Sequence, residues 1–340
     1  MKRIEAEEFL RLGNSIPVID VRSPQEFISG HIPGAVNIPL FDNEERAVVG
    51  TKYKKEGRSE AILEGLKLIG PGMHNKLAQA IKNSKDGRLL VHCWRGGMRS
   101  ESMAWLFSLG DIETFVLEGG YKSYRNHILQ KLSEKREMIV LGGMTGSSKT
   151  HILNWIGRNG HQFIDLEKLA SHKGSAFGSL GQPAQPSTEQ FANDLFREWQ
   201  LLDPVKPVWL EDESRNIGTV FLPEVFYNNM QEVKTIVLMM DIKTRLPRLM
   251  EEYSGYPPEI LRASVMKISK RLGGDNTHDA IRAIDEGDIA KAIEISLKYY
   301  DKAYQYSIKR KPSGEIIYVE TDTDDIEINA GKVLSAALRK

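Results

Sequence analysis

Hydrophobic residues lie along the chain in short runs, separated by amphipathic stretches. Many of the runs are rich in β-branched residues, and each ends in a polar or glycine-containing turn. Short apolar runs of this kind are typical of buried parallel strands, with helices in the stretches between them. The sequence therefore predicts an α/β fold. The predicted strands are 17–20, 89–92, 115–117, 138–141, 208–210 and 235–240.

The length of 340 residues favours two domains. Residues 122–137 are rich in basic side chains, lack strand character and separate two strand–loop–helix units. We therefore predict a first α/β domain over 1–125, a basic linker helix over 126–137 and a second α/β domain over 138–340. Helical spacing of apolar residues predicts that much of 243–312 is helical. Gly, Ser and Pro over 171–188 predict a long irregular loop.

Composition narrows the classes of function. The 46 Lys and Arg residues balance 46 Asp and Glu residues, so a nucleic acid would have to bind a local basic surface. The single cysteine, Cys93, excludes an intrachain disulfide and a multi-cysteine metal site. No apolar run has the length of a membrane span, and no signal peptide is expected. We therefore expect a cytoplasmic protein.

Cys93 lies in a loop that follows the strand 89–92 and precedes a helix beginning near residue 100. Unpaired amides at a helix N-terminus favour an anion, and this setting favours a thiolate. Neighbouring glycines allow the loop amides to point inward, and neighbouring arginines add cationic donors. We therefore predict a loop that binds a tetrahedral oxyanion, or that carries a persulfide or perselenide. The predicted catalytic residues are Cys93, Arg95, Gly96, Gly97 and Arg99.

Residues 20–27 (DVRSPQEF) and 30–39 (GHIPGAVNIP), together with the cysteine loop, resemble the rhodanese family over about 1–125. The resemblance implies that both segments are mainly scaffold, so His31 is not assigned to catalysis. Five residues separate Cys93 from Arg99, one more than in the usual sulfur-carrying loop and the same number as in cysteine phosphatases. Two interpretations follow: a phosphatase in which Cys93 attacks phosphorus, or a transferase in which Cys93 accepts sulfur or selenium.

A glycine-rich segment, 142–150 (GGMTGSSKT), follows the strand 138–141 and precedes a helical pattern. This context is that of a phosphate-binding P-loop, in which backbone amides and a lysine surround phosphate groups. Ser148 occupies the position where the Walker motif has glycine, so a positive φ there would strain the backbone. We therefore expect binding of a diphosphate more readily than hydrolysis of a nucleoside triphosphate. The predicted phosphate-binding residues are Gly143, Thr145, Gly146, Ser147, Ser148, Lys149 and Thr150.

Three consecutive acids, 211–213, follow the strand 208–210. In P-loop folds an acid at this strand end binds Mg²⁺ directly or through water. Glu211 and Asp212 are the candidates, and Arg215 is positioned to contact a phosphate or substrate. We expect a magnesium ion, if one binds, on Thr150 and Asp212.

The cysteine loop, the P-loop and the segments 165–167, 172–175, 211–215 and 270–274 together resemble the tRNA 2-selenouridine synthase family. The resemblance implies an N-terminal rhodanese-like domain, a C-terminal P-loop domain with a helical part, and conversion of 2-thiouridine to 2-selenouridine at the wobble position. It implies an S-geranyl intermediate, with geranyl diphosphate held by the P-loop and selenium from selenophosphate transferred at Cys93. It also implies selenophosphate synthase as a candidate partner protein.

The resemblance implies a tRNA partner, and basic side chains in three segments are the candidate contacts. Tyrosines in the last predicted helix are either base-stacking or core residues, and their helical spacing favours the core. The competing interpretations are a kinase or nucleotidase, a cysteine phosphatase with a regulatory rhodanese-like domain, and a protein-binding scaffold. The candidate tRNA contacts are Lys122, Arg125, Lys131, Lys135, Arg136, Arg262, Lys267, Lys270, Arg271, Lys309, Arg310 and Lys311, and the tyrosines are Tyr299, Tyr300, Tyr304 and Tyr306.

Overall fold

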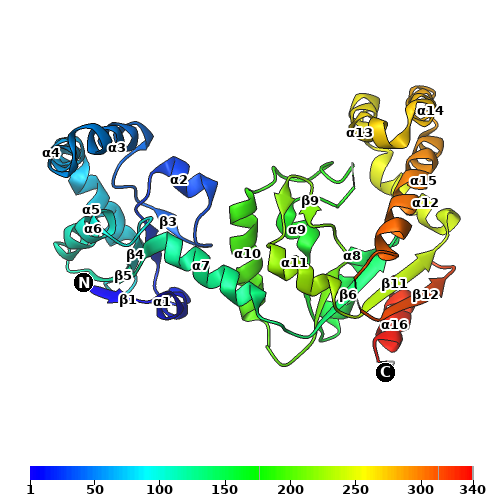
Figure 1. The fold of residues 1–340 in the computed structure, drawn as a ribbon, viewed down its shortest axis with the longest axis horizontal. Helices are drawn as coiled ribbons and strands as arrows, with labels where there is room; N and C mark the ends of the chain where they lie inside the picture. Colours follow the sequence, from blue (N-terminus) through cyan, green and yellow to red (C-terminus); the bar gives the residue numbers. More distant parts are fainter. Residues whose placement is uncertain (176, 313, 339–340) are drawn as a thin grey trace. The chain divides into compact units, whose positions relative to one another are not determined.

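A computed structural model describes residues 1–175, 177–312 and 314–338. The chain forms two compact units, each built on its own sheet (Figure 1). Unit 1 contains Met1–Lys131 and Ala192–Arg197, and unit 2 contains Leu132–Phe191 and Glu198–Lys340. Both main sheets have five strands, and every strand pair in them is parallel. The predicted α/β class with two domains is confirmed.

The sheet of unit 1 has the strand order β1-β5-β4-β2-β3. Its strands are β1 (Lys2–Ile4), β2 (Val18–Asp20), β3 (Val36–Asn37), β4 (Arg88–His92) and β5 (Glu113–Leu117). Its helices are α1 (Ala6–Gly13), α2 (Pro24–Ser29), α3 (Asn43–Glu56), α4 (Arg58–Ile69), α5 (Met73–Asn83), α6 (Met98–Ser108) and α7 (Gly120–Ser133), with a 3₁₀ turn at Gly70–Gly72. Strand β4 lies between β5 and β2, so the loop that follows it emerges at the middle of the sheet's carboxyl edge.

The sheet of unit 2 has the strand order β12-β11-β6-β8-β7. Its strands are β6 (Met138–Gly143), β7 (Gln162–Ile164), β8 (Val208–Glu211), β11 (Thr235–Met240) and β12 (Ile316–Thr321), and β9 (Asn216–Ile217) and β10 (Val220–Phe221) form a separate hairpin. Its helices are α8 (Lys149–Arg158), α9 (Leu166–Ala170), α11 (Glu224–Gln231), α12 (Ile242–Tyr253), α13 (Pro258–Leu272), α14 (Gly274–Asp285), α15 (Ile289–Ile308) and α16 (Ile326–Ala337). Helix α10 (Thr188–Leu201) is divided, since its segment Ala192–Arg197 is assigned to unit 1. The first strand, β6, lies centrally, between β11 and β8.

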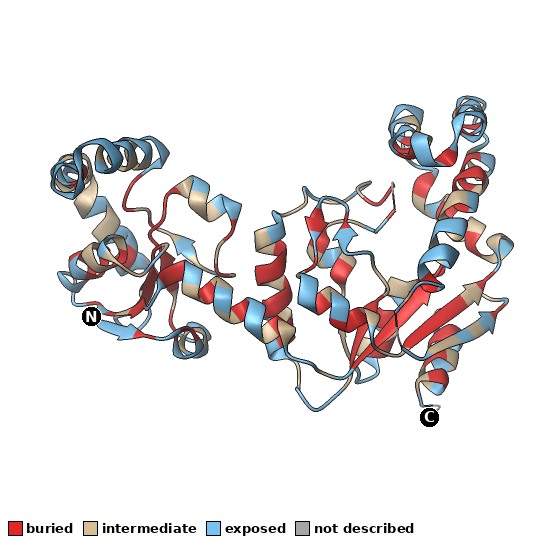
Figure 2. Ribbon diagram, viewed as in Figure 1, coloured by how far each residue is buried: buried red, intermediate tan, exposed pale blue. Residues whose placement is uncertain are grey.

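The strands predicted from the apolar runs are all present, because those runs are the buried centres of the two sheets (Figure 2). The helices α12 to α15 occupy the stretch predicted to be helical. The region predicted as a linker helix is covered by α7 only as far as Ser133, and this helix begins earlier, at Gly120. After α15 the chain returns to the sheet as β12 and is followed by α16, which packs on α8.

Each unit has its own hydrophobic core. In unit 1 the inner strands pack against α5 and α6 through side chains such as Val91 and Phe107. In unit 2 one core lies between the sheet and the helices α8 and α16, and a second joins α12 to α15. Of the helices in the described part of the chain, none is long and apolar enough to cross a membrane.

Candidate functional site

The P-loop connects the central strand β6 to the helix α8, so its backbone turns at the carboxyl edge of the unit 2 sheet. Gly146 has φ of +84°, and an added Cβ there would lie 2.8 Å from Leu249 Cδ1. Lys149 folds back over the loop and donates to the carbonyl oxygen of Gly143 at 3.2 Å. Position 146 therefore accepts only glycine without strain, and Lys149 reaches back to the start of the loop.

Ser148 adopts the left-handed conformation that the Walker pattern normally assigns to glycine, with φ of +64° and ψ of +24°. Its side chain makes no capping bond to α8, although the residue is the N-cap. The Ser148 and Ser147 hydroxyl oxygens are buried without a hydrogen-bond partner. The strain expected from the sequence is therefore present, and two buried hydroxyls at the loop have bonding capacity to offer a ligand.

Thr150 is surrounded by acidic side chains. Its hydroxyl oxygen lies 2.5 Å from Glu211 Oε1 and 3.2 Å from Glu167 Oε2. Glu211 ends strand β8 and is fully buried, and its second carboxylate oxygen has no partner. Burial, followed by repulsion from Glu167, raises the Glu211 pKa well above its usual range. The same two causes raise the pKa of Glu213 to about 8. A ligand that supplies positive charge would relieve this repulsion.

The pairing of Thr150 with Asp212 in one metal site is not what the structure shows. The Asp212 carboxylate accepts hydrogen bonds from Tyr304 at 3.1 Å and from Lys311 at 2.9 Å. Lys311 and Asp212 are nearly buried, with side-chain exposures of 3% and 10%. Since α15 and the residues after it take both Asp212 oxygens, Glu211 is the acid of this strand end that contacts Thr150.

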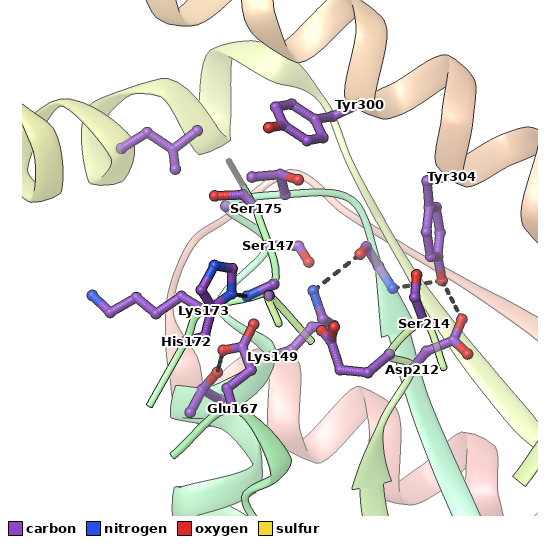
Figure 3. Close-up of a pocket in the computed structure, with 18 of the residues that line it drawn as sticks. Ser147, Lys149, Glu167, His172, Lys173, Ser175, Asp212, Ser214, Tyr300 and Tyr304 are labelled. Carbon is purple, nitrogen blue, oxygen red and sulfur yellow. Dashed lines mark hydrogen bonds between the residues drawn. The ribbon is translucent and has the colours of Figure 1, made fainter. Parts of the chain in front are cut away.

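The hydroxyl of Tyr304 also accepts a hydrogen bond from the Gly143 backbone N–H at 2.8 Å (Figure 3). One tyrosine thus joins α15 to the P-loop and to the strand end that carries Asp212. Burial, followed by the Asp212 charge, raises the pKa of Tyr304, so the hydroxyl stays protonated. The predicted site residue Arg215 lies apart from these contacts, half-exposed and paired with Glu224 on α11 at 3.2 Å.

The P-loop opens into a cavity of about 970 Å³. One side consists of the loop itself with Asp165, Glu167, Asp212 and Glu213, and the opposite side consists of side chains from α12, α13 and α15 (Figure 3). Glu211 is not part of the lining and reaches the site only through its contact with Thr150. The second side combines apolar and aromatic groups, including Leu249, Ile268 and Tyr300, with Arg248, Lys267 and Arg271. The P-loop and a surface that carries both apolar and basic side chains therefore face the same space. The predicted phosphate-binding residues all line it: Gly143, Thr145, Gly146, Ser147, Ser148, Lys149 and Thr150.

The cysteine loop forms the second candidate site, in unit 1. Cys93 is buried, and its sulfur lies 3.3 Å from the Ser100 hydroxyl. Gly96 has φ of +64°, and an added Cβ would lie 2.5 Å from the Leu117 carbonyl oxygen. Gly120 is equally constrained from the other side, since its Cβ would lie 2.4 Å from the Cys93 carbonyl oxygen. The turn before α7 therefore fixes the shape of the cysteine loop.

The two arginines of the loop differ in their surroundings. Arg99 donates to both carboxylate oxygens of Glu26, at 2.8 and 3.4 Å, and Arg95 is exposed. Glu26 also accepts from the Ser23 backbone N–H at 3.1 Å, and the Arg99 guanidinium holds its pKa below the usual range. Glu26 thus fixes Arg99 beside the loop, and Arg95 is the cation free to follow a ligand.

A buried polar group supports the loop from below. Arg22 donates to Asp20 through its Nε and Nη2 atoms, and its guanidinium lies 3.8 Å from the centre of the Tyr121 ring. His92 lies beside Asp20 and is fully buried. Burial lowers the pKa of His92 to about 4, so the imidazole is neutral at physiological pH. The buried pair of Asp20 and Arg22 fits the scaffold role that the resemblance implies for the segment 20–27.

Sequence reasoning missed the roles of several residues at both sites. Glu26 precedes Arg99 by 73 residues, and Tyr304 follows Gly143 by 161 residues, so local spacing carried no signal for either contact. Lys311 was a candidate RNA contact, but its charge is buried against Asp212. Of the other basic candidates, Arg262 pairs with Asp285, and Lys267 and Arg271 line the P-loop cavity. Tyr306 is 61% exposed, which separates it from the tyrosines packed nearer the core.

Two family models match the chain. Residues 5–127 match the rhodanese-like domain, and residues 136–330 match the tRNA 2-selenouridine synthase AAA domain. Proteins described as tRNA 2-selenouridine synthases are similar over most of the chain. The protein of Nitrosomonas europaea is 34% identical over 87% of this chain and 90% of its own. The protein of Shewanella piezotolerans is 36% identical over 91% of this chain and 93% of its own. The protein of Bdellovibrio bacteriovorus is 35% identical over 92% of this chain and 81% of its own.

Proposed function

The chain belongs to the tRNA 2-selenouridine synthase family, and we propose from this premise that it converts 2-thiouridine to 2-selenouridine at the wobble position of tRNA. The proposed route has two steps, each at one of the two sites. Sulfur is first alkylated by geranyl diphosphate, and the S-geranyl group then leaves as a thiol when selenium attacks the ring carbon. Alkylation is needed because the sulfur of a thiocarbonyl is a poor leaving group.

The cavity of unit 2 is the proposed site of alkylation, and the observation that carries the proposal is its two-sided lining. Lys149, the loop amides and the buried hydroxyls of Ser147 and Ser148 suit a diphosphate. Leu249, whose Cδ1 would lie 2.8 Å from a Cβ added to Gly146, begins the apolar side on which a geranyl chain would lie. A strained serine at position 148 is compatible with this ligand, since a diphosphate needs a smaller set of contacts than a triphosphate.

A magnesium ion fits this site in part. No group of three or more His, Cys, Asp or Glu side chains in residues 1–175, 177–312 and 314–338 has the geometry of a metal site. Two oxygen ligands are available, the unpartnered carboxylate oxygen of Glu211 and the hydroxyl of Thr150, which contacts the same carboxylate. The diphosphate would supply others. Bound there, the ion would neutralise charge on the leaving pyrophosphate. Thr150 and Glu211 are the residues that would hold it.

The cysteine loop of unit 1 is the proposed site of selenium transfer. Selenophosphate is a tetrahedral anion, and the loop amides with Arg95 and Arg99 match its charge. Cys93 would help to hold selenophosphate and present its selenium to the activated base: the carbon–selenium bond forms as the carbon–sulfur bond breaks and geranyl thiol leaves, and water then takes the phosphoryl group as phosphate. Selenophosphate synthase is the proposed partner that supplies the donor. A phosphatase would use the same loop, but the family match extends through the second domain as well.

The test is reconstitution with 2-thiouridine tRNA, geranyl diphosphate and selenophosphate, followed by mass spectrometry of the digested nucleosides. The wild-type protein should give 2-selenouridine. Cys93→Ala should accumulate geranylated 2-thiouridine without 2-selenouridine, because the alkylation site lies in the other unit. Normal selenation by Cys93→Ala would contradict the role of this cysteine, and absence of both products with the wild-type protein would contradict the proposed function.

A further inference from the structure

A second cavity of about 520 Å³ lies beside the P-loop cavity in unit 2. It is formed by α11, by the last turn of α15 and by the residues that follow α15. Three residues, Tyr227, Gln231 and Ser307, line both cavities. The two cavities therefore adjoin, and together we call them the groove. A chain-like ligand with one end at the P-loop is close enough to reach the second cavity.

The chemistry of the second cavity differs from that of the first. Its lining contains two tyrosines, two side-chain amides and one exposed guanidinium, from Tyr227, Tyr306, Asn228, Gln231 and Arg310. Tyr306 is 61% exposed. The Arg310 guanidinium lies 4.9 Å from the centre of the Tyr306 ring and donates to its hydroxyl. A ring and a guanidinium held together in this way form a platform on which a planar base can stack.

The charges in this cavity are mostly neutralised. Lys311 is paired with Asp212 at 2.9 Å and is almost fully buried. Glu232, the acid of the lining, is paired with Lys135 at 3.2 Å. Arg310 is left to contact a phosphate, so binding here must depend mainly on stacking and amide hydrogen bonds. That balance fits unpaired nucleotides, whose bases are available for stacking, better than the phosphate surface of a duplex.

We propose that this second cavity, formed by α11 and the end of α15, binds the unpaired nucleotides that flank the modified uridine. The inference rests on the proposed function, which places the target base at the P-loop cavity. Tyr306 stacks on one flanking base, Arg310 contacts its phosphate, and the amides of Asn228 and Gln231 contact base edges. Lys311 and Tyr304 do not contact RNA: they fix the end of α15 on Asp212 and on the P-loop.

The test measures binding of a fluorescent anticodon stem-loop RNA, with 2-thiouridine at the wobble position, to the full chain. Tyr306→Ala should weaken binding about tenfold, the scale expected when one stacked base is lost, and Tyr306→Phe should bind as the wild type does. Arg310→Ala should lower the slope of log affinity against log salt concentration by about 0.7, the value for one phosphate of a single strand.

Two variants serve as matched controls. Tyr53→Ala removes a tyrosine of similar exposure, 59%, from α3 of unit 1, and Arg158→Ala removes an exposed arginine from the last turn of α8. Both should bind the RNA as the wild type does. Affinity for pyrophosphate should stay within about twofold in all variants, which shows that the P-loop is intact.

The outcomes distinguish RNA binding in the groove from the proposed enzymatic function. Weaker RNA binding by Tyr306→Ala and Arg310→Ala, with unchanged controls, supports RNA binding in the groove even if no nucleoside product forms. Wild-type RNA affinity in both groove variants, or an equal loss in the controls, overturns the groove. If the wild-type protein makes 2-selenouridine while the groove variants bind RNA normally, the proposed function stands and this inference fails.

Discussion

Replacement of Ser148 by glycine should stabilise unit 2 by about 1 kcal/mol. The left-handed conformation that Ser148 adopts, at φ of +64°, destabilises the folded state by roughly 1–2 kcal/mol for a residue with a Cβ. Glycine removes this strain, but the greater freedom that it gives the unfolded chain lowers the free energy of unfolding by about 0.5–1 kcal/mol. No helix cap is lost, because the Ser148 side chain makes no capping bond. Removal of a buried hydroxyl without a partner adds to the gain.

The measurement is calorimetric unfolding of the full chain, in which the two units are expected to give separate transitions. For a domain of this size, about 1 kcal/mol corresponds to a rise in Tm of roughly 2–4 °C. Ser148→Ala is the matched control, since it removes the hydroxyl and keeps the Cβ in the strained conformation. The reasoning fails if Ser148→Gly leaves the Tm unchanged or lowers it. An equal rise in both variants would assign the effect to the hydroxyl and not to φ.

Two further predictions concern unit 1. Gly120→Ala should destabilise unit 1 and abolish selenium transfer, since the new Cβ would overlap the Cys93 carbonyl oxygen. Gly34→Ala is the control: Gly34 has φ of +86° with open space around it, so in the same calorimetric assay this variant should lower the stability of unit 1 only by the ~1 kcal/mol of backbone strain. His92 has a pKa of about 4 in the fold and 6.5 as its ordinary value, so the unfolded chain binds a proton in this range that the folded chain does not. Stability should therefore be full above about pH 6.5 and fall as the pH drops toward 4. Thermal unfolding across this range should show a shallower fall for His92→Gln, and an unchanged fall would contradict the assignment; the exposed His278→Gln is the control.

The strands and both loops could be predicted from the sequence because they depend on local patterns. A buried parallel strand is a continuous apolar run, and each loop follows such a run directly, as Gly143 follows the apolar part of β6. The strain at Ser148 was also predictable, since the Walker pattern specifies which position needs a positive φ. These features require no knowledge of how distant segments pack.

The partners of the site residues could not be predicted in the same way. Asp212 and Glu211 are adjacent, yet one faces Tyr304 and Lys311 and the other faces Thr150. Alternation along the end of β8 sends neighbouring side chains in different directions, and only the path of α15 decides which acid remains available. The edge strands β1, β3, β7 and β12 escaped prediction. The first three are only two or three residues long and partly exposed, and β12 is longer but mostly not buried, so none of them is a continuous buried apolar run.

The order of the two steps is the central claim, and Lys149→Ala tests it most directly. Removal of one electrostatic contact to a reacting group typically lowers a rate by about two orders of magnitude or more. We expect this variant to make neither product from 2-thiouridine tRNA, yet to make 2-selenouridine from tRNA that already carries the geranyl group, as measured by nucleoside mass spectrometry. An equal loss with both substrates, from a variant with wild-type circular dichroism and RNA affinity, would contradict the separation of alkylation from selenium transfer.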